Sequence, residues 1–221
     1  MIVNEIVTGI IVIIIGYLLG SIPSAYIAAR LATGKDIRQL GGGNVGGLNV
    51  FREAGFWPAL AVGIIDLGKG AAAVAIAHWL LHLPPLYVLL AGLAAVIGHN
   101  WMVFLKFSGG KGMGPTIGAL AILLPVYGYW PGLLIFFGII AIPFIITRNV
   151  ALSMSIGLVS LPFIAWLGMH SGLFVVWSIV LGIIIVIRFL PTAVRAWAEA
   201  DTKKEFIFDR WQRDRDKQEE L

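Results

Sequence analysis

Long apolar runs separated by short polar segments dominate the pattern of this chain. Several runs reach the roughly 20 residues that a helix needs to cross the hydrocarbon core of a bilayer. The pattern predicts an all-α integral membrane protein with about seven transmembrane helices, of which the fourth is short and could be partly re-entrant. The expected helices cover approximately residues 6–29, 57–81, 86–105, 117–126, 131–146, 150–167 and 172–187.

These helices are expected to form a single domain over residues 1–190, followed by a charged cytoplasmic tail over residues 191–221. Gly16-x-x-x-Gly20 in the first span is a close-packing pattern, and Pro23 is expected to kink that span. The tail mixes basic, acidic and aromatic residues. It is consistent with an interfacial amphipathic helix and equally with a solvated, partly helical segment.

The Lys and Arg residues are unevenly distributed over this topology. With seven spans they fall after the first, third and fifth spans and in the tail, and only Lys69 lies within a span. The N-terminus and the turns near Leu83, Gly128 and His170 carry none. By the positive-inside rule the basic side is cytoplasmic and the N-terminus is outside. A five-span topology would keep this sidedness only if spans were lost in pairs.

Composition supports a membrane protein and narrows its chemistry. Hydrophobic residues make up 59% of the 221 residues and charged residues 13%, an apolar fraction above that of ordinary soluble domains. The absence of cysteine excludes disulfides, thiolate metal sites and a cysteine nucleophile. The basic cytoplasmic side accounts for the net charge of +4, so nucleic acid is not an expected partner.

The segment with the most chemical character runs from Gly41 to Arg52, in the loop between the first two expected spans. Five of its twelve residues are glycine, so a regular helix is not expected across its first half. The segment also contains two asparagine side chains, Asn44 and Asn49. Exposed backbone N–H groups and the guanidinium of Arg52 make it a candidate cradle for a phosphate.

A second glycine-rich segment, Gly109-Gly110-Lys111-Gly112, follows the third expected span. Lys111 has glycine on both sides, so backbone N–H groups can approach a ligand beside its ammonium. Taken alone, Lys111 is an ordinary interfacial lysine. Two such loops on one face favour an anion-binding site.

Three ionisable residues are expected within spans or at their ends. Asp66 and Lys69 lie three residues apart on one helical face. Two interpretations are open: an ion pair that joins helices, or a support that orients the site. His99 is either a buried structural histidine or a catalytic one. The sequence shows no nucleophilic serine setting, no His-x-x-x-x-Asp acyltransferase pattern and no metal-ligating cluster, and it implies no cofactor.

Taken in order, these motifs resemble a known family over residues 20–115. They are Gly20-Ser21-Ile22-Pro23, Gly-x-Gly-Asn-x-Gly-x-x-Asn-x-x-Arg at residues 41–52, Asp66/Lys69-Gly70, Gly98-His99, and Phe107-x-Gly-Gly-Lys-Gly112. The chain is similar to the bacterial acyl-phosphate:glycerol-3-phosphate acyltransferases of the PlsY type.

This resemblance implies an inner-membrane enzyme of phospholipid biosynthesis. It would transfer an acyl chain from acyl phosphate to the 1-position of glycerol 3-phosphate, giving lysophosphatidic acid and phosphate. It implies catalytic roles for Lys111, Arg52 and Asn44, with Asp66 and Lys69 as a supporting ion pair. The expected substrate-binding residues are Gly41, Gly42, Gly43, Asn49, His99, Gly109, Gly110, Gly112 and Arg195.

The chain also departs from the family pattern. Gly42 stands where the family usually has serine, and a His-x-x-Asn-x-x-Arg segment corresponds to Phe189, Thr192 and Arg195. Two other hypotheses follow: a diverged member that binds a phosphate or phospholipid without turnover, and a small-solute transporter, because broken helices and glycine loops also line transport paths. Acyl-chain length and oligomeric state are not predicted.

Overall fold

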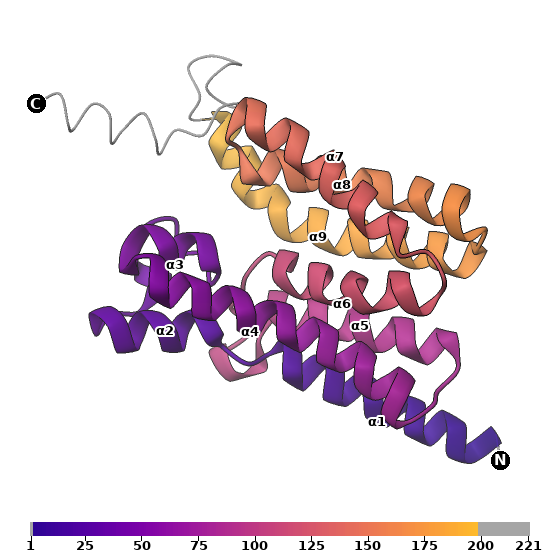
Figure 1. The fold of residues 1–221 in the computed structure, drawn as a ribbon. Helices are drawn as coiled ribbons and strands as arrows, with labels where there is room; N and C mark the ends of the chain where they lie inside the picture. Colours follow the sequence, from indigo (N-terminus) through magenta and orange to yellow (C-terminus); the bar gives the residue numbers. More distant parts are fainter. Residues whose placement is uncertain (1, 199–221) are drawn as a thin grey trace, which may run out of the picture. The chain divides into compact units, whose positions relative to one another are not determined.

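The computed structural model describes residues 2–198, and its ordered elements are helices joined by short loops (Figure 1). The chain divides into two compact units, Met1–Gly128 and Tyr129–Leu221. The elements of the first unit are α1 (Ile2–Gly20), α2 (Ser24–Thr33), η1 (Ile37–Gln39), α3 (Gly47–Ala54), α4 (Phe56–Ala75), η2 (Ile76–Leu80), α5 (Pro85–Asn100), η3 (Val103–Leu105) and α6 (Met113–Val126).

The first expected span is broken rather than kinked, because α1 ends at Gly20 and α2 begins at Ser24. Pro23 has no N–H to donate and disfavours helical geometry at Ile22. The Ile22 carbonyl accepts a hydrogen bond from Lys69 Nζ at 2.9 Å. A backbone group freed by the break is thus satisfied inside the protein, as an apolar environment requires.

Small residues bring α1 and α5 into close contact. A Cβ at Gly16 would lie 2.6 Å from the Ala91 carbonyl oxygen, and one at Gly20 would overlap the carbonyl of Ala95. The Gly16-x-x-x-Gly20 pattern therefore lets two helix backbones approach one another. Near the break, Tyr17 Oη donates to the Trp101 carbonyl at 2.8 Å, which ties α1 to the end of α5.

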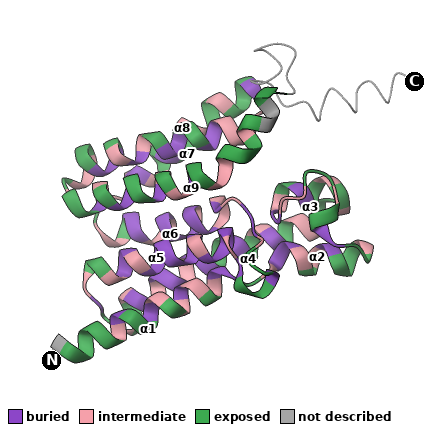
Figure 2. Cartoon of the chain, turned by 180° about the vertical axis from the view of Figure 1, so that it is seen from behind, coloured by how far each residue is buried: buried purple, intermediate pink, exposed green. Residues whose placement is uncertain are grey.

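Helices α4 and α6 pack in the same way. A Cβ at Gly70 would overlap the Pro115 carbonyl, and one at Gly118 would overlap the carbonyl of Leu67. Helix α6 begins at Met113, directly after the second glycine-rich segment, and thus starts before residue 117, the expected start of the fourth span. Figure 2 shows buried residues concentrated where the helices of this unit face one another.

The second unit consists of α7 (Pro131–Thr147), α8 (Val150–Ile164), η4 (Ala165–Met169) and α9 (Gly172–Ala198). Pro131 stands in the first turn of α7, and Asn149 caps α8 by accepting from Leu152 N–H at 3.1 Å. Helix α9 extends past the expected end of the last span at residue 187. Most of the charged tail lies outside the described residues.

Five helical segments are long and apolar enough to cross a membrane. They are Val3–Thr33, Phe56–Leu80, Pro85–Leu105, Val150–Met169 and Gly172–Val194, while Met113–Val126 and Pro131–Thr147 are shorter apolar helices. Large apolar side chains of α1 point outward, with Ile10 and Ile14 each 52% exposed. Such a surface is suited to lipid rather than to water.

Candidate active site

The glycine-rich stretch of residues 41–52 forms a loop that leads into a helix. Residues 47–52 belong to α3, whose N-cap is Gly46, so Arg52 lies in the second turn of that helix. Val50 N–H donates to the Gly46 carbonyl at 3.1 Å and closes the first turn. The loop thus ends at a helix N-terminus, where the helix dipole favours an anion.

Asn49 holds this loop together. Its buried side-chain amide donates to the carbonyls of Leu40 and Asn44, both at 3.0 Å, and to that of Ile37 at 3.4 Å. The Asn49 side chain is therefore occupied in shaping the loop, while Asn44 is half-buried within it.

The three consecutive glycines at 41–43 have different environments. Gly41 and Gly43 have φ values of +51° and +69°, which strain any residue with a Cβ. A Cβ at Gly41 would also lie 2.6 Å from Glu53 Oε1. Gly42 does not have a positive φ, and a Cβ there would meet nothing within 4 Å.

The second loop wraps around the C-terminal end of α5. Its first part is closed by Phe107 N–H, which donates to the Met102 carbonyl at 2.9 Å. Gly110 N–H then donates to the His99 carbonyl at 3.0 Å. Gly112, at φ +74°, caps α6, so half-buried Lys111 stands immediately before a second helix N-terminus.

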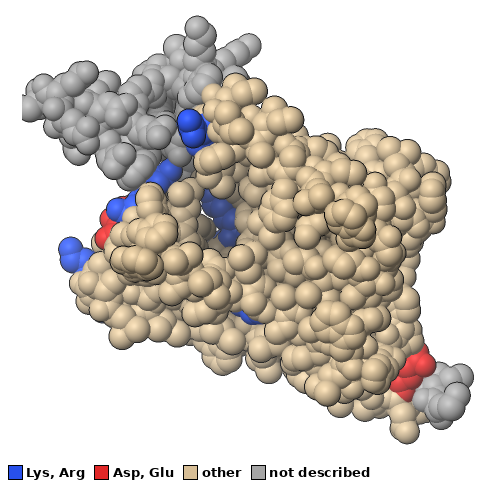
Figure 3. Space-filling model, in the orientation of Figure 1, with Lys and Arg blue, Asp and Glu red and all other residues tan. Residues whose placement is uncertain are grey.

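The two loops meet at Gly110. A Cβ at this position would overlap His99 Nε2 and lie 2.7 Å from the carbonyl oxygen of Val45, in the first loop. The expectation that both glycine-rich segments share one face therefore corresponds to direct contact. Figure 3 shows Lys and Arg side chains gathered at the end of the first unit where α2 and α3 lie.

A buried ionic network lies beneath this meeting point. Lys69 Nζ is 2.9 Å from Asp66 Oδ1, and the same oxygen accepts from Ser24 Oγ at 2.6 Å. His99 Nδ1 lies 3.6 Å from it. The network joins α2, α4 and α5, with Asp66, Lys69 and His99 all less than 6% exposed.

Sequence reasoning missed three buried polar residues in this region. Ser24 donates a hydrogen bond to Asp66. The only sequence feature that could have singled it out is its place directly after Pro23. The Asn100 side chain packs against Gly112, with Oδ1 2.8 Å from the position of a Cβ there. Within the described part of the chain, neither Asn100 nor Thr116 has a side-chain hydrogen-bond partner, and both residues are fully buried.

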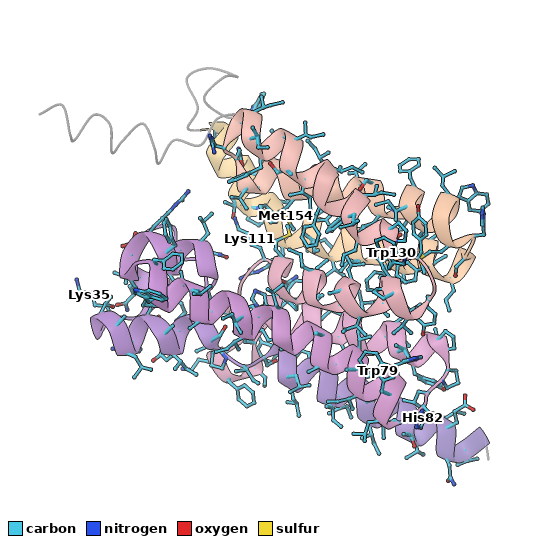
Figure 4. All side chains as sticks on the ribbon, viewed as in Figure 1. Lys35, Trp79, His82, Lys111, Trp130 and Met154 are labelled. Atoms are coloured by element: carbon cyan, nitrogen blue, oxygen red, sulfur yellow. The ribbon has the colours of Figure 1, made fainter. Side chains whose placement is uncertain are left out.

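Taken together, the first unit offers two glycine loops, two helix N-termini and two cations, Arg52 and Lys111. Figure 4 shows Lys111 on the side of the unit that carries α3, away from His82. Such a site can bind two anionic groups side by side. The side chain of Arg195, a further expected binding residue, lies outside the described residues.

Comparison with known proteins gives a consistent family. A family model described as glycerol-3-phosphate acyltransferase matches residues 10–199. Glycerol-3-phosphate acyltransferase 1 of Dehalococcoides mccartyi is 49% identical over 201 residues, which cover 91% of this chain and 97% of that protein. Glycerol-3-phosphate acyltransferase of Parasynechococcus marenigrum is 38% identical over 91% of this chain and 92% of its own length.

Two solved structures share the fold. The glycerol 3-phosphate form of PlsY (YgiH), an integral membrane glycerol 3-phosphate acyltransferase, matches with a TM-score of 0.79 and 28% identity, covering 93% of this chain and 98% of that one. The lysophosphatidic acid form matches with a TM-score of 0.73 and 27% identity, over 86% and 92% of the two chains.

Proposed function

Because this chain belongs to the glycerol-3-phosphate acyltransferase family, a family of membrane acyltransferases of phospholipid synthesis, we propose that it acylates the 1-hydroxyl of glycerol 3-phosphate with acyl phosphate as donor. The hydroxyl oxygen attacks the acyl carbonyl carbon and forms an ester bond, and the bond from that carbon to the phosphate oxygen breaks. The products are lysophosphatidic acid and phosphate, which takes up the hydroxyl proton.

The observation that carries this proposal is the contact between the two glycine loops at Gly110 and Val45. The reaction brings together two phosphorylated substrates, and each loop ends at its own helix N-terminus. Acyl phosphate is already activated, so holding the substrates in line and stabilising the developing charge can supply most of the barrier reduction.

In this mechanism each loop holds one substrate. Lys111, with the amides of Gly109, Gly110 and Gly112, holds the phosphate of the donor. Arg52 and Asn44 hold glycerol 3-phosphate against Gly41, Gly42 and Gly43, in a loop whose shape Asn49 maintains. The acyl chain lies in the bilayer between helices.

The same proposal includes an arrangement in the membrane. Seven helices cross the inner membrane, with α6 and α7 as the short ones. The N-terminus is outside, and both glycine loops and the C-terminal tail are cytoplasmic. This follows from the distribution of Lys and Arg, and it gives the site access to cytoplasmic glycerol 3-phosphate.

The test is turnover by the purified protein in lipid nanodiscs, with long-chain acyl phosphate and radiolabelled glycerol 3-phosphate. Lys111→Ala should lower kcat by about 100-fold or more, as loss of one charge-stabilising donor does. Arg52→Ala should raise KM for glycerol 3-phosphate at least about tenfold, because a charge-assisted contact is lost. Lys35→Ala, which removes an exposed cation outside both loops, is the matched control.

Two outcomes would contradict the proposal. Full activity in both loop variants would remove the residue assignments. Tight binding of glycerol 3-phosphate with no lysophosphatidic acid formed over hours would identify a family member that binds without turnover.

A further inference from the structure

His99 connects the buried ionic network to the second glycine loop. Its Nδ1 lies 3.6 Å from Asp66 Oδ1, and its Nε2 would overlap a Cβ at Gly110. We propose that Asp66 and His99 are a positioning pair that holds Gly110, and with it Lys111, against the first loop. This inference rests on the proposed role of the Lys111 loop.

The Asp66 carboxylate is itself fixed in position. Ser24 Oγ and Lys69 Nζ contact the same oxygen, Oδ1, at 2.6 and 2.9 Å, and Lys69 Nζ is in turn bound to the Ile22 carbonyl at the helix break. Ser24 lies in α2, Lys69 lies in α4 beside Asp66, and Ile22 lies in the segment between α1 and α2. Because buried charged groups need such partners, the network makes Asp66 a rigid support for the His99 ring.

His99 contacts Gly110 through both its backbone and its side chain. The His99 carbonyl accepts the Gly110 N–H at 3.0 Å, and the imidazole packs on the same residue from the side of Nε2. The His99 side chain is only 4% exposed. Its effect on the reaction therefore passes through the loop, and it is a positioning residue rather than a catalytic one.

Gly110 is the point where three segments meet, and only a residue without a side chain fits there. A Cβ would overlap the His99 ring and come within 2.7 Å of the Val45 carbonyl. Lys111 is the next residue, so a shift of the imidazole changes the place of the ammonium relative to the first loop. A misplacement of about 1 Å can cost about 100-fold in rate.

The test separates the two substrates by their KM values. In His99→Ala, kcat should fall about 10- to 100-fold and KM for acyl phosphate should rise about tenfold, while KM for glycerol 3-phosphate stays within about twofold. A loss of folded enzyme alone would lower apparent kcat and leave both KM values unchanged. His78→Ala, which removes a histidine of η2, is the matched control.

Two further variants keep the test decisive if His99→Ala is poorly folded. Ser24→Ala removes one support of Asp66 and should shift the KM for acyl phosphate in the same direction by a smaller factor. Gly110→Ala should impair the enzyme by itself, and the double variant with His99→Ala should be less impaired than the product of the two single effects, because both changes act on one contact.

The positioning role is overturned if folded His99→Ala and Ser24→Ala keep the wild-type KM for acyl phosphate, or if both KM values rise equally. Full activity in Gly110→Ala would overturn it as well. Full activity in Lys111→Ala would instead contradict the proposed function of the Lys111 loop, so failure of the inference and failure of the proposal are distinguishable.

Discussion

At the scale of single residues, Gly42 is the position where the first loop differs most simply from the family pattern. The family usually has serine there, and the backbone of this chain would accept one. Gly42 lies outside the positive-φ region, and the space around its Cβ position is open. The missing hydroxyl is therefore a difference in chemistry and not a consequence of a different loop shape.

We expect Gly42→Ser to leave thermal stability unchanged and to lower KM for glycerol 3-phosphate by up to about fivefold. One added hydrogen bond contributes about 1 kcal/mol. Gly43→Ser is the matched control, because Gly43 has φ +69° and its Cβ would lie 3.1 Å from the Arg38 carbonyl. It should lower the melting temperature. An increase in KM for Gly42→Ser would show that the hydroxyl has no place in this loop.

Asp36 is a second residue whose chemistry can be tested alone. Its carboxylate accepts the backbone N–H of Arg38 at 3.0 Å and pairs with the Arg38 guanidinium at 2.6 Å. These contacts, with the side-chain hydrogen bond first, lower the pKa of Asp36 from 3.8 to about 2. The pair fixes the turn that precedes the first glycine loop.

Because the folded-state pKa is lowered, the ionised carboxylate stabilises the fold. This contribution is complete above about pH 4 and disappears as the pH falls through about 2. Asp36→Asn should therefore melt below the wild type at pH 6, and the difference should close between about pH 4 and pH 2. The difference in the free energy of unfolding between the two proteins should stay below about 1 kcal/mol, because Arg38 is partly exposed and water screens the ion pair. A difference at pH 2 as large as that at pH 6 would have another cause.

At the scale of elements, packing between α4 and α6 depends on one glycine of α4, Gly70. Gly70 faces α6 and touches the Pro115 backbone, whereas Gly68, two residues earlier, has open space at its Cβ position. The same helix thus contains one glycine required by contact and one that is not. This contact also holds the N-terminus of α6, where Lys111 stands.

Replacing each of these glycines by alanine should have opposite results. Gly70→Ala should lower the melting temperature by several degrees, because α6 must move away from α4. Gly68→Ala should be neutral or stabilising by up to about 1 kcal/mol, since alanine favours the helix. Thermal unfolding in detergent measures both. Equal effects of the two substitutions would mean that the α4–α6 contact is not tight.

At the scale of the whole molecule, the orientation in the membrane is open to a direct test. Figure 4 shows Lys35 and His82 at opposite ends of the first unit. The chain has no cysteine, so a single introduced cysteine reports its own side. The distribution of Lys and Arg predicts that Lys35 is cytoplasmic and His82 is outside.

A membrane-impermeant maleimide should label His82→Cys in intact spheroplasts and label Lys35→Cys only after the membrane is opened. Turnover of each variant confirms that the protein is folded. Labelling of both positions from the same side would rule out an odd number of crossings between them.

The sequence by itself determined the class of this protein and most of its local structure. The apolar runs and the distribution of Lys and Arg reflect the free energy of moving each side chain between water and lipid. This free energy is a property of single residues, so it can be assigned from the sequence alone. The glycine loops and the one-face spacing of Asp66 and Lys69 are also local, because backbone sterics and helical periodicity act over a few residues. Near Pro23 the sequence predicted a kink, and the structure has a break.

Only the tertiary structure decided which distant groups meet. No local rule links Val45 to Gly110, or Ser24 and His99 to Asp66, since these contacts depend on how α2, α4 and α5 pack. The same packing showed that Gly42 is open and Gly70 is not. Glycine patterns mark where backbones can approach, but the partner is selected by the close packing of whole helices.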